Sequence, residues 1–331
     1  MKSRRREFLQ MVGAGAIGMG LAATAPSAPA QNAAKSRSKL KIIFRADDVG
    51  YTDVHNIGTF EAIEKGVVTA ADIMLECPGT VDALKKLKTM PWISVGWHTH
   101  FWGSPVLNPK EVPSLVMNDE GRIRFRKDLS TAKDVVFEEA LKEMRAQLDR
   151  CVKLLGRAPD TGPGGGRGDS PYGKAMSQVV KEYKIRNYVM PINPGAWAGG
   201  APPAPGQPLS GRLAVAALNT DSLTDIMKYD PLMYYLNDTS HILDLPEGSI
   251  DVEVWHPGYV DYFVLHMGSS TAKANNYLLC RPKDVEALTS PKLKSWIKEH
   301  RIELINFRDA MDGTNEYQNH LKAIGSDLCM I

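Results

Sequence analysis

Short apolar runs alternate with segments of helical periodicity along most of the chain, and this alternation is the strongest constraint on its fold. The β-branched run at residues 41–45 predicts a strand, and the apolar spacing over residues 53–66 predicts a helix after it. Further strands are predicted at 71–75, 93–98, 186–190, 250–255 and 302–307, and further helices at 80–90, 131–156, 173–183 and 291–300. Alternating strands and helices are typical of a parallel sheet covered by helices.

The number of these units favours an α/β barrel in a single domain. About seven strand–helix units in roughly 270 residues predict a closed or nearly closed (β/α) barrel of about seven strands. An open sheet of that size more often carries a nucleotide-binding loop, and the sequence has no GxGxxG or Walker pattern. We expect one domain over residues 40–331, with a proline- and glycine-rich insertion near 191–212 over one end of the barrel.

The first thirty residues have the features of an export signal. Arg5-Arg6-Glu7-Phe8-Leu9 contains the core of a twin-arginine signal, and a weakly apolar stretch and the cleavage site Ala28-Pro29-Ala30 follow it. The apolar stretch falls short of the roughly 20 residues that span a bilayer. We therefore expect residues 1–30 to be removed and residues 31–39 to form a disordered lead. The mature protein should be periplasmic or secreted, without stable membrane insertion.

Composition narrows the range of partners. Hydrophobic residues make up 43% of the 331 positions, which is enough for a core and unlike a disordered protein. The formal net charge of +2 is too close to zero for a dedicated nucleic-acid binder, so no nucleic-acid partner is expected. The four cysteines form no CxxC pair, which argues against a zinc–thiolate site and leaves their disulfide pairing open. The sequence also leaves the oligomeric state open.

Two adjacent carboxylates follow the first predicted strand. Asp47 and Asp48 repel each other, so each needs a partner to stay ionised. Because side chains alternate along an extended chain, the two point in different directions and suit different tasks, one as a metal ligand and the other as a base. The alternative for this pair is a turn that caps a helix.

Histidines stand at two further predicted strand ends. His98 and His100 are two residues apart and point to the same side, which suits a divalent metal ion, whereas a lone histidine more often belongs to a core. His256 precedes Pro257-Gly258, which force a turn and leave the imidazole at the mouth of the barrel. Its titration range suits general acid catalysis, with a structural turn residue as the alternative.

Several motifs occur in an ordered set over about residues 41–310. They are Ala46-Asp47-Asp48-Val49-Gly50, Asn56-Ile57-Gly58, Lys65-Gly66-Val67-Val68-Thr69-Ala70, Val95-Gly96-Trp97-His98, His256-Pro257-Gly258-Tyr259-Val260-Asp261 and Arg281-Pro282. In this set the chain resembles the YdjC-like carbohydrate deacetylases, which are related to polysaccharide deacetylases. The resemblance implies a deformed (β/α) barrel and one divalent metal ion, Zn or Mg. It also implies a carbohydrate substrate: an N-acetylated amino sugar, an oligosaccharide or a cell-envelope glycan that loses acetyl groups.

The resemblance also implies roles for four residues. Asp47 would be the general base, Asp48 and His98 would be metal ligands, and His256 would be the acid near the leaving amine. The presence of all four together favours a working site over a degenerate one.

One ligand of the family is absent from this chain. The family has a histidine in an Asp-Ser-His-x-His pattern, where this sequence has Asp160-Thr161-Gly162 and a glycine-rich loop. His100 is the first choice for a substitute third ligand, because its spacing from His98 aims it inward, and Asp169 or Asp160 from the replaced loop is the alternative.

Three functions follow from these observations. The first is a metal-dependent deacetylase of N-acetylated sugars, and the second is a metal hydrolase with the same barrel that acts on another amide or ester. The third is a non-catalytic exported glycan-binding protein with a degenerate metal site. The sequence fixes neither the sugar, nor its chain length, nor the identity of the metal.

Overall fold

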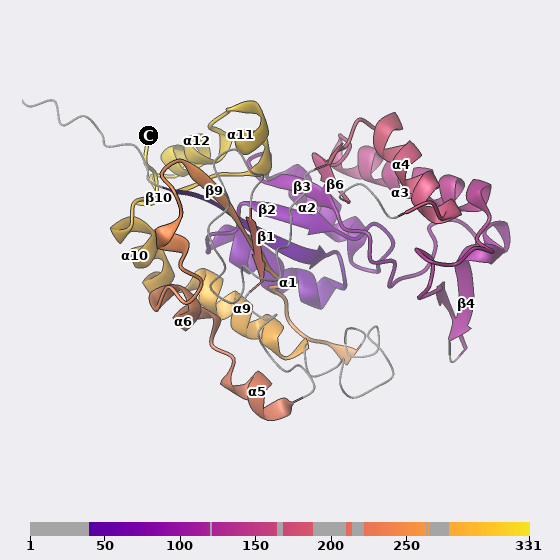
Figure 1. Cartoon of the computed structure of the whole chain (residues 1–331), viewed down its shortest axis with the longest axis horizontal. Coiled ribbons are helices and arrows are strands. Elements are labelled where there is room, and N and C mark those ends of the chain that lie inside the picture. Colours follow the sequence, from indigo (N-terminus) through magenta and orange to yellow (C-terminus); the bar gives the residue numbers. More distant parts are fainter. Residues whose placement is uncertain are drawn as a thin grey trace, which may run out of the picture. The chain divides into compact units, whose positions relative to one another are not determined.

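A parallel sheet forms the centre of the fold. The computed structural model describes residues 40–119, 121–163, 168–187, 210–213, 222–262, 264 and 278–331, and residues 38–331 form one compact unit. The sheet has eight strands in the order β7-β6-β3-β2-β1-β9-β8, with β10 also paired to β1 (Figure 1). Its strands are β1 (Leu40–Val49), β2 (Ala70–Ile73), β3 (Ser94–Trp97), β6 (Thr161–Gly162), β7 (Arg186–Asn187), β8 (Ser210–Leu213), β9 (Ser249–Trp255) and β10 (Ile302–Leu304).

Strand β1 is the central element of this sheet. It pairs with β9 along one edge, from Leu40 to Ala46. Its other edge is divided between two partners: β10 pairs with residues 40–42, and β2 pairs with residues 45–49. The strand therefore continues through Asp47 and Asp48 to Val49, whereas the sequence predicts its end at residue 45.

The prediction of about seven strands needs correction, because this sheet has eight. The additional strands are β6 and β8, and β6 has only two residues, too few to produce a hydrophobic period. The strand predicted at 186–190 is present as β7, described over Arg186–Asn187. Strand β8 occupies residues 210–213, where the predicted insertion ends, and residues 191–209 of that insertion lie outside the described residues. Among the described strands, β7 and β8 end the sheet without pairing to each other, so barrel closure is not seen.

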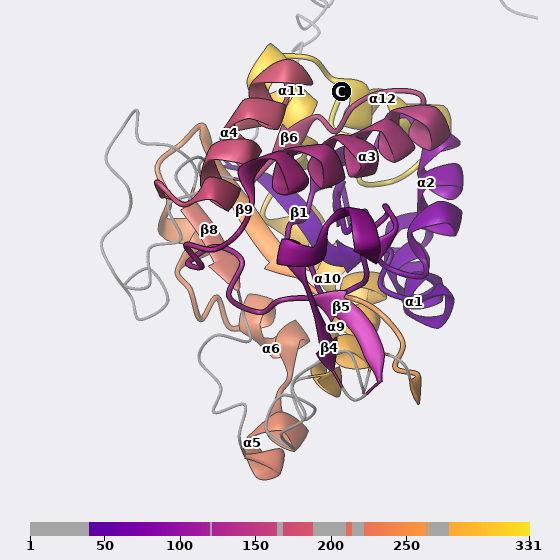
Figure 2. The same cartoon turned by 90° about the vertical axis from the view of Figure 1, so that its right-hand side faces the viewer.

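The sequence predicts five of the ten described helices, near residues 53–66, 80–90, 131–156, 173–183 and 291–300, and the other five were not predicted. These ten helices cover the sheet. They are α1 (Asp53–Glu64), α2 (Thr80–Lys88), α3 (Phe137–Leu155), α4 (Pro171–Glu182), α5 (Leu223–Lys228), α6 (Pro231–Leu236), α9 (Cys280–Thr289), α10 (Pro291–Glu299), α11 (Phe307–Asp312) and α12 (Glu316–Ala323). Helices α3 and α4 pack together, as Figure 2 shows, and α9 packs against α1, α6 and α10. Within the described residues, no helix combines the length and apolarity that crossing a bilayer requires.

Helix α3 shows how sequence sets the ends of an element. It ends as expected at Gly156, whose left-handed φ of 94° suits a residue without a Cβ. It begins at Phe137 rather than residue 131, because Val136 is extended and the preceding turn is held by ion pairs from Arg126 to Asp128 and Asp134. A two-stranded antiparallel hairpin, β4 (Val116–Asp119) and β5 (Arg122–Phe125), precedes this helix and was not predicted.

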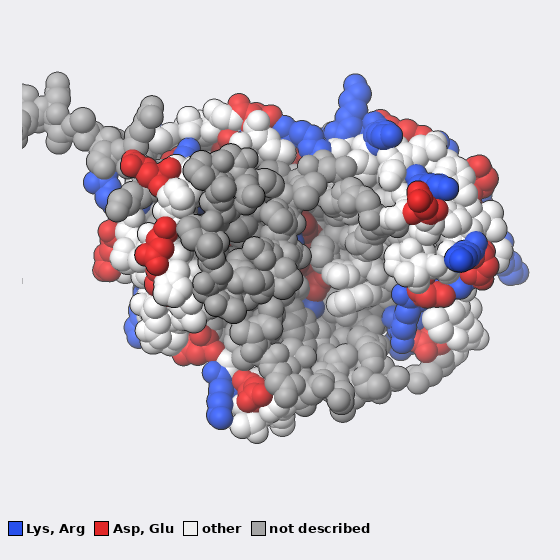
Figure 3. Space-filling model, viewed as in Figure 1, with Lys and Arg blue, Asp and Glu red and all other residues white. Residues whose placement is uncertain are grey.

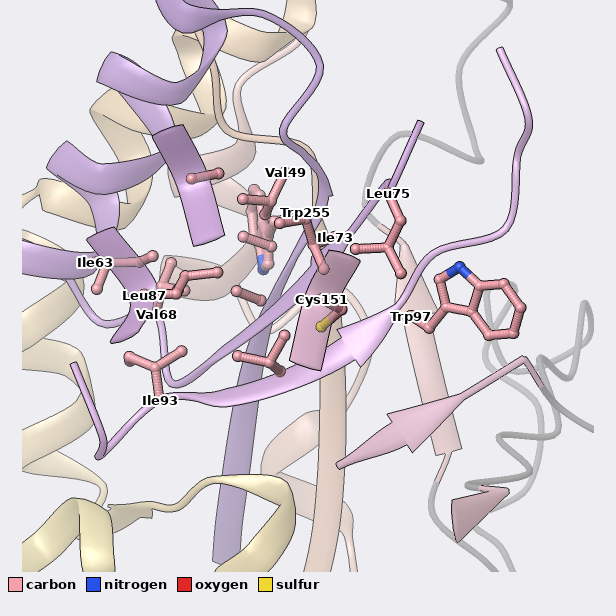
Figure 4. Close-up of a cluster of buried hydrophobic side chains, with 14 of the residues drawn as sticks. Val49, Ile63, Val68, Ile73, Leu75, Leu87, Ile93, Trp97, Cys151 and Trp255 are labelled. Carbon is pink, nitrogen blue, oxygen red and sulfur yellow. The ribbon is translucent and has the colours of Figure 1, made fainter. Parts of the chain in front are cut away.

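The core lies between the sheet and its helices. Ile73 of β2, Leu87 of α2 and Cys151 of α3 belong to one buried cluster, which Trp97 and Trp255 extend along the sheet (Figure 4). Each such side chain contributes roughly 1.5–3 kcal/mol by leaving water. Cys151 is a buried free thiol, as its place on an apolar helix face predicts.

Candidate active site

Polar side chains gather at the carboxyl ends of four adjacent strands, in the order β3-β2-β1-β9. His98 follows β3, Asp72 lies near the end of β2, and His256 follows β9. Asp47 and Asp48 stand between them, near the end of β1. Because all these strands are parallel, their carboxyl ends meet at one edge of the sheet, where α/β folds build their sites.

A β-bulge shapes the Asp47–Asp48 pair. Ala46 pairs with Ala71 and Val49 pairs with Ile73, so Asp47 and Asp48 together stand opposite the single residue Asp72. Asp48 also has a φ of 61°, a left-handed conformation that few residues other than Gly, Asn and Asp adopt. The bulge changes the outcome expected from simple alternation. Both carboxylates reach the same imidazole nitrogen, His98 Nε2, at 3.9 Å from Asp47 and 3.0 Å from Asp48.

Asp47 is held by a neighbour on its own strand. Arg45 donates from Nε to Oδ1 at 2.6 Å and from Nη2 to Oδ2 at 2.8 Å, and its Nη1 lies 3.4 Å from Asp72 Oδ2. Burial raises the pKa of Asp47, but Arg45, His98 and His256 outweigh this effect and the net shift is downward. Asp47 is therefore a buried carboxylate that stays ionised at neutral pH.

Asp48 has a different partner, from the far end of the chain. Arg281 of α9 places Nη2 2.5 Å from Asp48 Oδ2, and its Nη1 lies 3.0 Å from His55 Nε2 of α1. Burial opposes ionisation of Asp48, but Arg281 and His98 hold its pKa well below the usual range. Gly258 packs against His55, where a Cβ would approach the ring to 2.2 Å. Only glycine fits at this point of the turn after His256.

The two predicted histidine ligands lie beside Asp48. His98 and His100 have ring centroids 4.3 Å apart, and one ligand atom from each, with one from Asp48, falls within a common span of 4.8 Å. Burial disfavours the charged form of His98, but Asp47 and Asp48 raise its pKa overall. The imidazole therefore lies beside two carboxylates that favour a positive charge. A divalent cation requires a negatively charged environment of this kind.

A second group of possible ligands shares His98 with the first. Asp47, Asp72 and His98 also offer atoms within 4.8 Å of one another. Arg45 occupies both oxygens of Asp47 and lies beside Asp72, so a guanidinium already supplies the positive charge there. Arg281 takes only Oδ2 of Asp48 and leaves Oδ1 open, so the group of Asp48, His98 and His100 suits a cation better.

His256 is held at this site by its backbone. Its N–H donates to Asp284 Oδ2 at 3.1 Å, and Asp284 Oδ1 accepts from Tyr229 Oη at 2.8 Å. Burial lowers the pKa of His256 to about 4, although Asp48 and Asp47 favour its charged form. The imidazole is therefore neutral at pH 7 in the resting protein, a condition the sequence did not reveal.

Asp160 and Asp169, the alternative ligands from the replaced loop, do not belong to the group of Asp48, His98 and His100. Asp160 Oδ2 accepts from the backbone N–H of Val95 at 2.8 Å and from Arg308 at 2.6 Å, so it ties the loop to β3 and α11. Asp169 is exposed just before α4. Among the described residues, neither joins a group of close ligand atoms, while residues 164–167 of the loop lie outside them.

Two residues of this site carry no local signal that marks them. Asp72 sits inside an apolar strand, opposite Gly96 of β3, where a Cβ would approach its Oδ1 to 1.9 Å. A buried aspartate whose neighbour across the sheet is glycine is recognisable only once the register is known. Arg281 reaches Asp48 across 233 positions of sequence, so no local pattern identifies it as a partner.

Comparison with known proteins identifies relatives that match most of the chain. A carbohydrate deacetylase from Brevibacillus brevis is 29% identical over 276 residues, covering 82% of this chain and 99% of the relative. Carbohydrate deacetylase 2 from Listeria innocua is 24% identical, covering 82% of this chain and 98% of that protein.

A solved structure from Enterococcus faecalis, described as a candidate cellobiose-phosphate cleavage protein, has 25% identity and a TM-score of 0.56. It covers 82% of this chain and 99% of its own. The matches support the predicted enzyme class, carbohydrate deacetylase. The YdjC-like protein family matches residues 41–299, so the chain belongs to that family.

Proposed function

We propose that the protein is a metal-dependent hydrolase that removes acetyl groups from N-acetylated amino sugars, including those of cell-envelope glycans. The observation that carries the proposal is the bulge in β1, which brings Asp47 and Asp48 to the same nitrogen of His98. One carboxylate is then free for proton transfer while the other joins the histidines as a ligand. The carbohydrate deacetylases among its relatives support the same chemistry.

The residues present fit a divalent metal ion. Asp48 Oδ1 and His98 Nε2 are buried, and neither has a well-oriented hydrogen-bond partner although they lie 3.0 Å apart. Two imidazoles and one carboxylate are typical of zinc, whereas magnesium prefers oxygen ligands alone. Asp48, His98 and His100 would therefore hold zinc in preference to magnesium.

The proposed reaction divides the work between Asp47 and His256. A divalent ion bound beside Asp48 would polarise the acetamide carbonyl as a Lewis acid. Asp47 accepts a proton from the attacking water. It can do so because Arg45 keeps this buried carboxylate ionised. His256, neutral at rest, takes over the proton that Asp47 removed from the water and delivers it to the leaving nitrogen, so both groups return to their starting states. Asp47 and Asp48 favour its charged form.

The decisive experiment measures metal content and acetate release on the same preparation. We expect close to one equivalent of metal after dialysis, and acetate release from N-acetylglucosamine oligomers that falls about 10²–10⁴-fold in Asp47→Asn. Retained metal with cleavage of synthetic esters, but no acetate release from the oligomers, would favour a metal hydrolase that acts on another amide or ester. Glycan binding without metal or acetate release would favour the non-catalytic alternative.

We further propose that the protein works in the periplasm or outside the cell, delivered by the twin-arginine pathway. The support is the Arg5-Arg6 pair with the apolar stretch and cleavage site behind it. Replacing both arginines with lysine should leave the precursor in the cytoplasm, which fractionation followed by immunoblotting detects. Unchanged export of the double variant would refute this proposal.

A further inference from the structure

A cavity of about 560 Å³ shares the side chain of Trp102 with the surroundings of the proposed metal site. The indole of Trp102 stacks on His100, with ring centroids 4.8 Å apart, and also lines the cavity. Glu76 lines it as well, and its Oε1 accepts from the backbone N–H of Trp102 at 3.2 Å. The cavity is thus one side chain removed from the site and large enough for a sugar unit.

The walls of this cavity are built from fixed elements. Hairpin β4–β5 is joined to the loop after β3 by the N–H of Phe125, which donates to Gly103 O, and by Ser104 Oγ, which donates to Ile123 O at 2.7 Å. Gly103 packs so closely on the loop after β2 that a Cβ would lie 2.3 Å from Glu76 O. A preformed wall of this kind lowers the entropic cost of binding.

Basic side chains dominate the charge of the lining. Arg122 and Arg124 come from β5, where Arg124 pairs with Asp119 at 3.0 Å, and Arg150 comes from α3. Glu76 is the only acidic residue among the described residues that line the cavity. Within the described part of the chain, no ion pair is found for the exposed Arg122. This local excess contrasts with the interspersed acidic and basic side chains on the face drawn in Figure 3. The cavity therefore favours an anionic ligand.

Glu76 decides which anion suits the cavity. It is 6% exposed, its Oε1 accepts from the N–H of Trp102, and its Oε2 is buried without a hydrogen-bond partner. Burial raises the pKa of Glu76 to about 7, so the group can donate a hydrogen bond from its protonated form. A singly charged carboxylate can accept that bond, whereas a doubly charged phosphate would meet stronger repulsion whenever Glu76 ionises.

We propose that this cavity, lined by Trp102, Arg122, Arg150 and Glu76, is a subsite for a carboxylate-bearing sugar unit next to the one that loses its acetyl group. The inference rests on the proposed function and specifies its substrate as an acidic glycan. Trp102 offers an aromatic surface to the sugar ring, and the guanidinium groups bind the carboxylate.

Direct binding tests the subsite separately from catalysis. Calorimetry would compare three disaccharides in which N-acetylglucosamine is joined to glucose, to glucuronic acid or to glucose 6-phosphate. We expect the glucuronate compound to bind at least 10-fold more tightly than the glucose compound. Arg122→Gln should reduce this preference at least fivefold, while Lys127→Gln, which removes an exposed charge outside the lining, should leave it unchanged.

Three results would overturn the subsite. They are equal binding of the glucose and glucuronate compounds, tighter binding of the phosphate compound, and a preference that survives Arg122→Gln. Acetate release from the glucose compound reports on the proposed function by itself. An enzyme that deacetylates this neutral compound without preferring glucuronate would keep the proposed function and lose the subsite.

Discussion

Arg45 binds both carboxylate oxygens of Asp47, with Nε 2.6 Å from Oδ1 and Nη2 2.8 Å from Oδ2. The same guanidinium lies 3.4 Å from Asp72 on the neighbouring strand. A bidentate contact of this kind fixes the orientation of the carboxylate as well as its charge. It keeps this buried carboxylate ionised and also makes it a weaker proton acceptor.

Removal of this contact should move the pH profile of the enzyme. Arg45 lowers the pKa of Asp47, so Arg45→Gln raises it, and the base becomes protonated at higher pH. The acid limb of kcat/KM for acetate release should therefore shift upward by about one pH unit or more. Arg45→Lys keeps the charge and should shift the limb less. An acid limb that stays in place in Arg45→Gln would show that Asp47 is not the titrating base.

His98→Ala should lose bound metal and activity together. The imidazole of His98 faces both carboxylates, and no other described group lies in the same position between them. Metal analysis after dialysis measures the loss. His241→Ala is the matched control, because His241 is exposed and pairs with Asp244 away from the site. A full equivalent of metal in His98→Ala would remove His98 from the ligand set.

The third ligand can be identified by comparing two substitutions. His100→Ala should weaken metal binding by roughly 10-fold or more, since His100 offers a nitrogen beside Asp48 and His98. Asp169→Ala should leave the affinity unchanged, because Asp169 is exposed before α4 and belongs to neither group of close ligands. Competition with a chelator of known affinity measures both. The reverse ranking would assign the ligand to the glycine-rich loop.

His256→Ala should distinguish substrates by their leaving group. An amide nitrogen needs a proton to leave, whereas the alcohol of an activated ester does not. The variant should keep its metal and lose far more activity on N-acetylated sugars than on activated acetyl esters, as steady-state kinetics can show. Equal losses on both substrates in a folded variant would contradict the acid role. Loss of the metal would instead make His256 a ligand.

The dependence of the free energy of unfolding on pH should report the raised pKa of Asp284. Burial raises the pKa of Asp284 to about 7, although Tyr229 and the N–H of His256 stabilise its charged form. The folded state then binds a proton that the unfolded chain releases at lower pH, so this contribution to stability is present below about pH 4 and lost as pH rises through 7.

Asp284→Asn should remove that dependence. The amide can still accept from the N–H of His256 and donate to a reoriented Tyr229 hydroxyl. The variant should gain about 4 kcal/mol over the native protein at pH 8 relative to pH 4, measured by urea unfolding. Asp225→Asn on the short helix α5 provides a comparison without a buried carboxyl. Parallel pH curves for Asp284→Asn and the native protein would show that Asp284 is ionised in the fold throughout.

The sequence predicts the parts of the site that follow from strand ends. Asp47, His98 and His256 each come at the end of an apolar run, and parallel pairing is sufficient to bring such positions to one edge. The direction of the two aspartates could not be predicted, because the bulge depends on how β1 and β2 register.

The missed parts depend on contacts between distant elements. Arg281 is a basic residue on a helix of little amphipathic character, and only the packing of α9 on α1 brings it to Asp48. The hairpin β4–β5 has polar and apolar residues without clear alternation, and its place is set by contacts with the loop at Gly103 and Ser104. Tertiary context decides such elements, so local propensity does not find them.

The divided edge of β1 has a consequence for the order in which the chain can fold. The first half of this strand is completed only by β10, which begins 262 positions later, at Ile302 against Leu40. Until synthesis has passed that point, the centre of the sheet has an open edge whose N–H and C=O groups can pair with another chain. Closing so long a loop is entropically slow, which makes strand β1 among the last parts to become fully paired. An export route that accepts only finished proteins would give this strand the time it needs before the membrane is crossed.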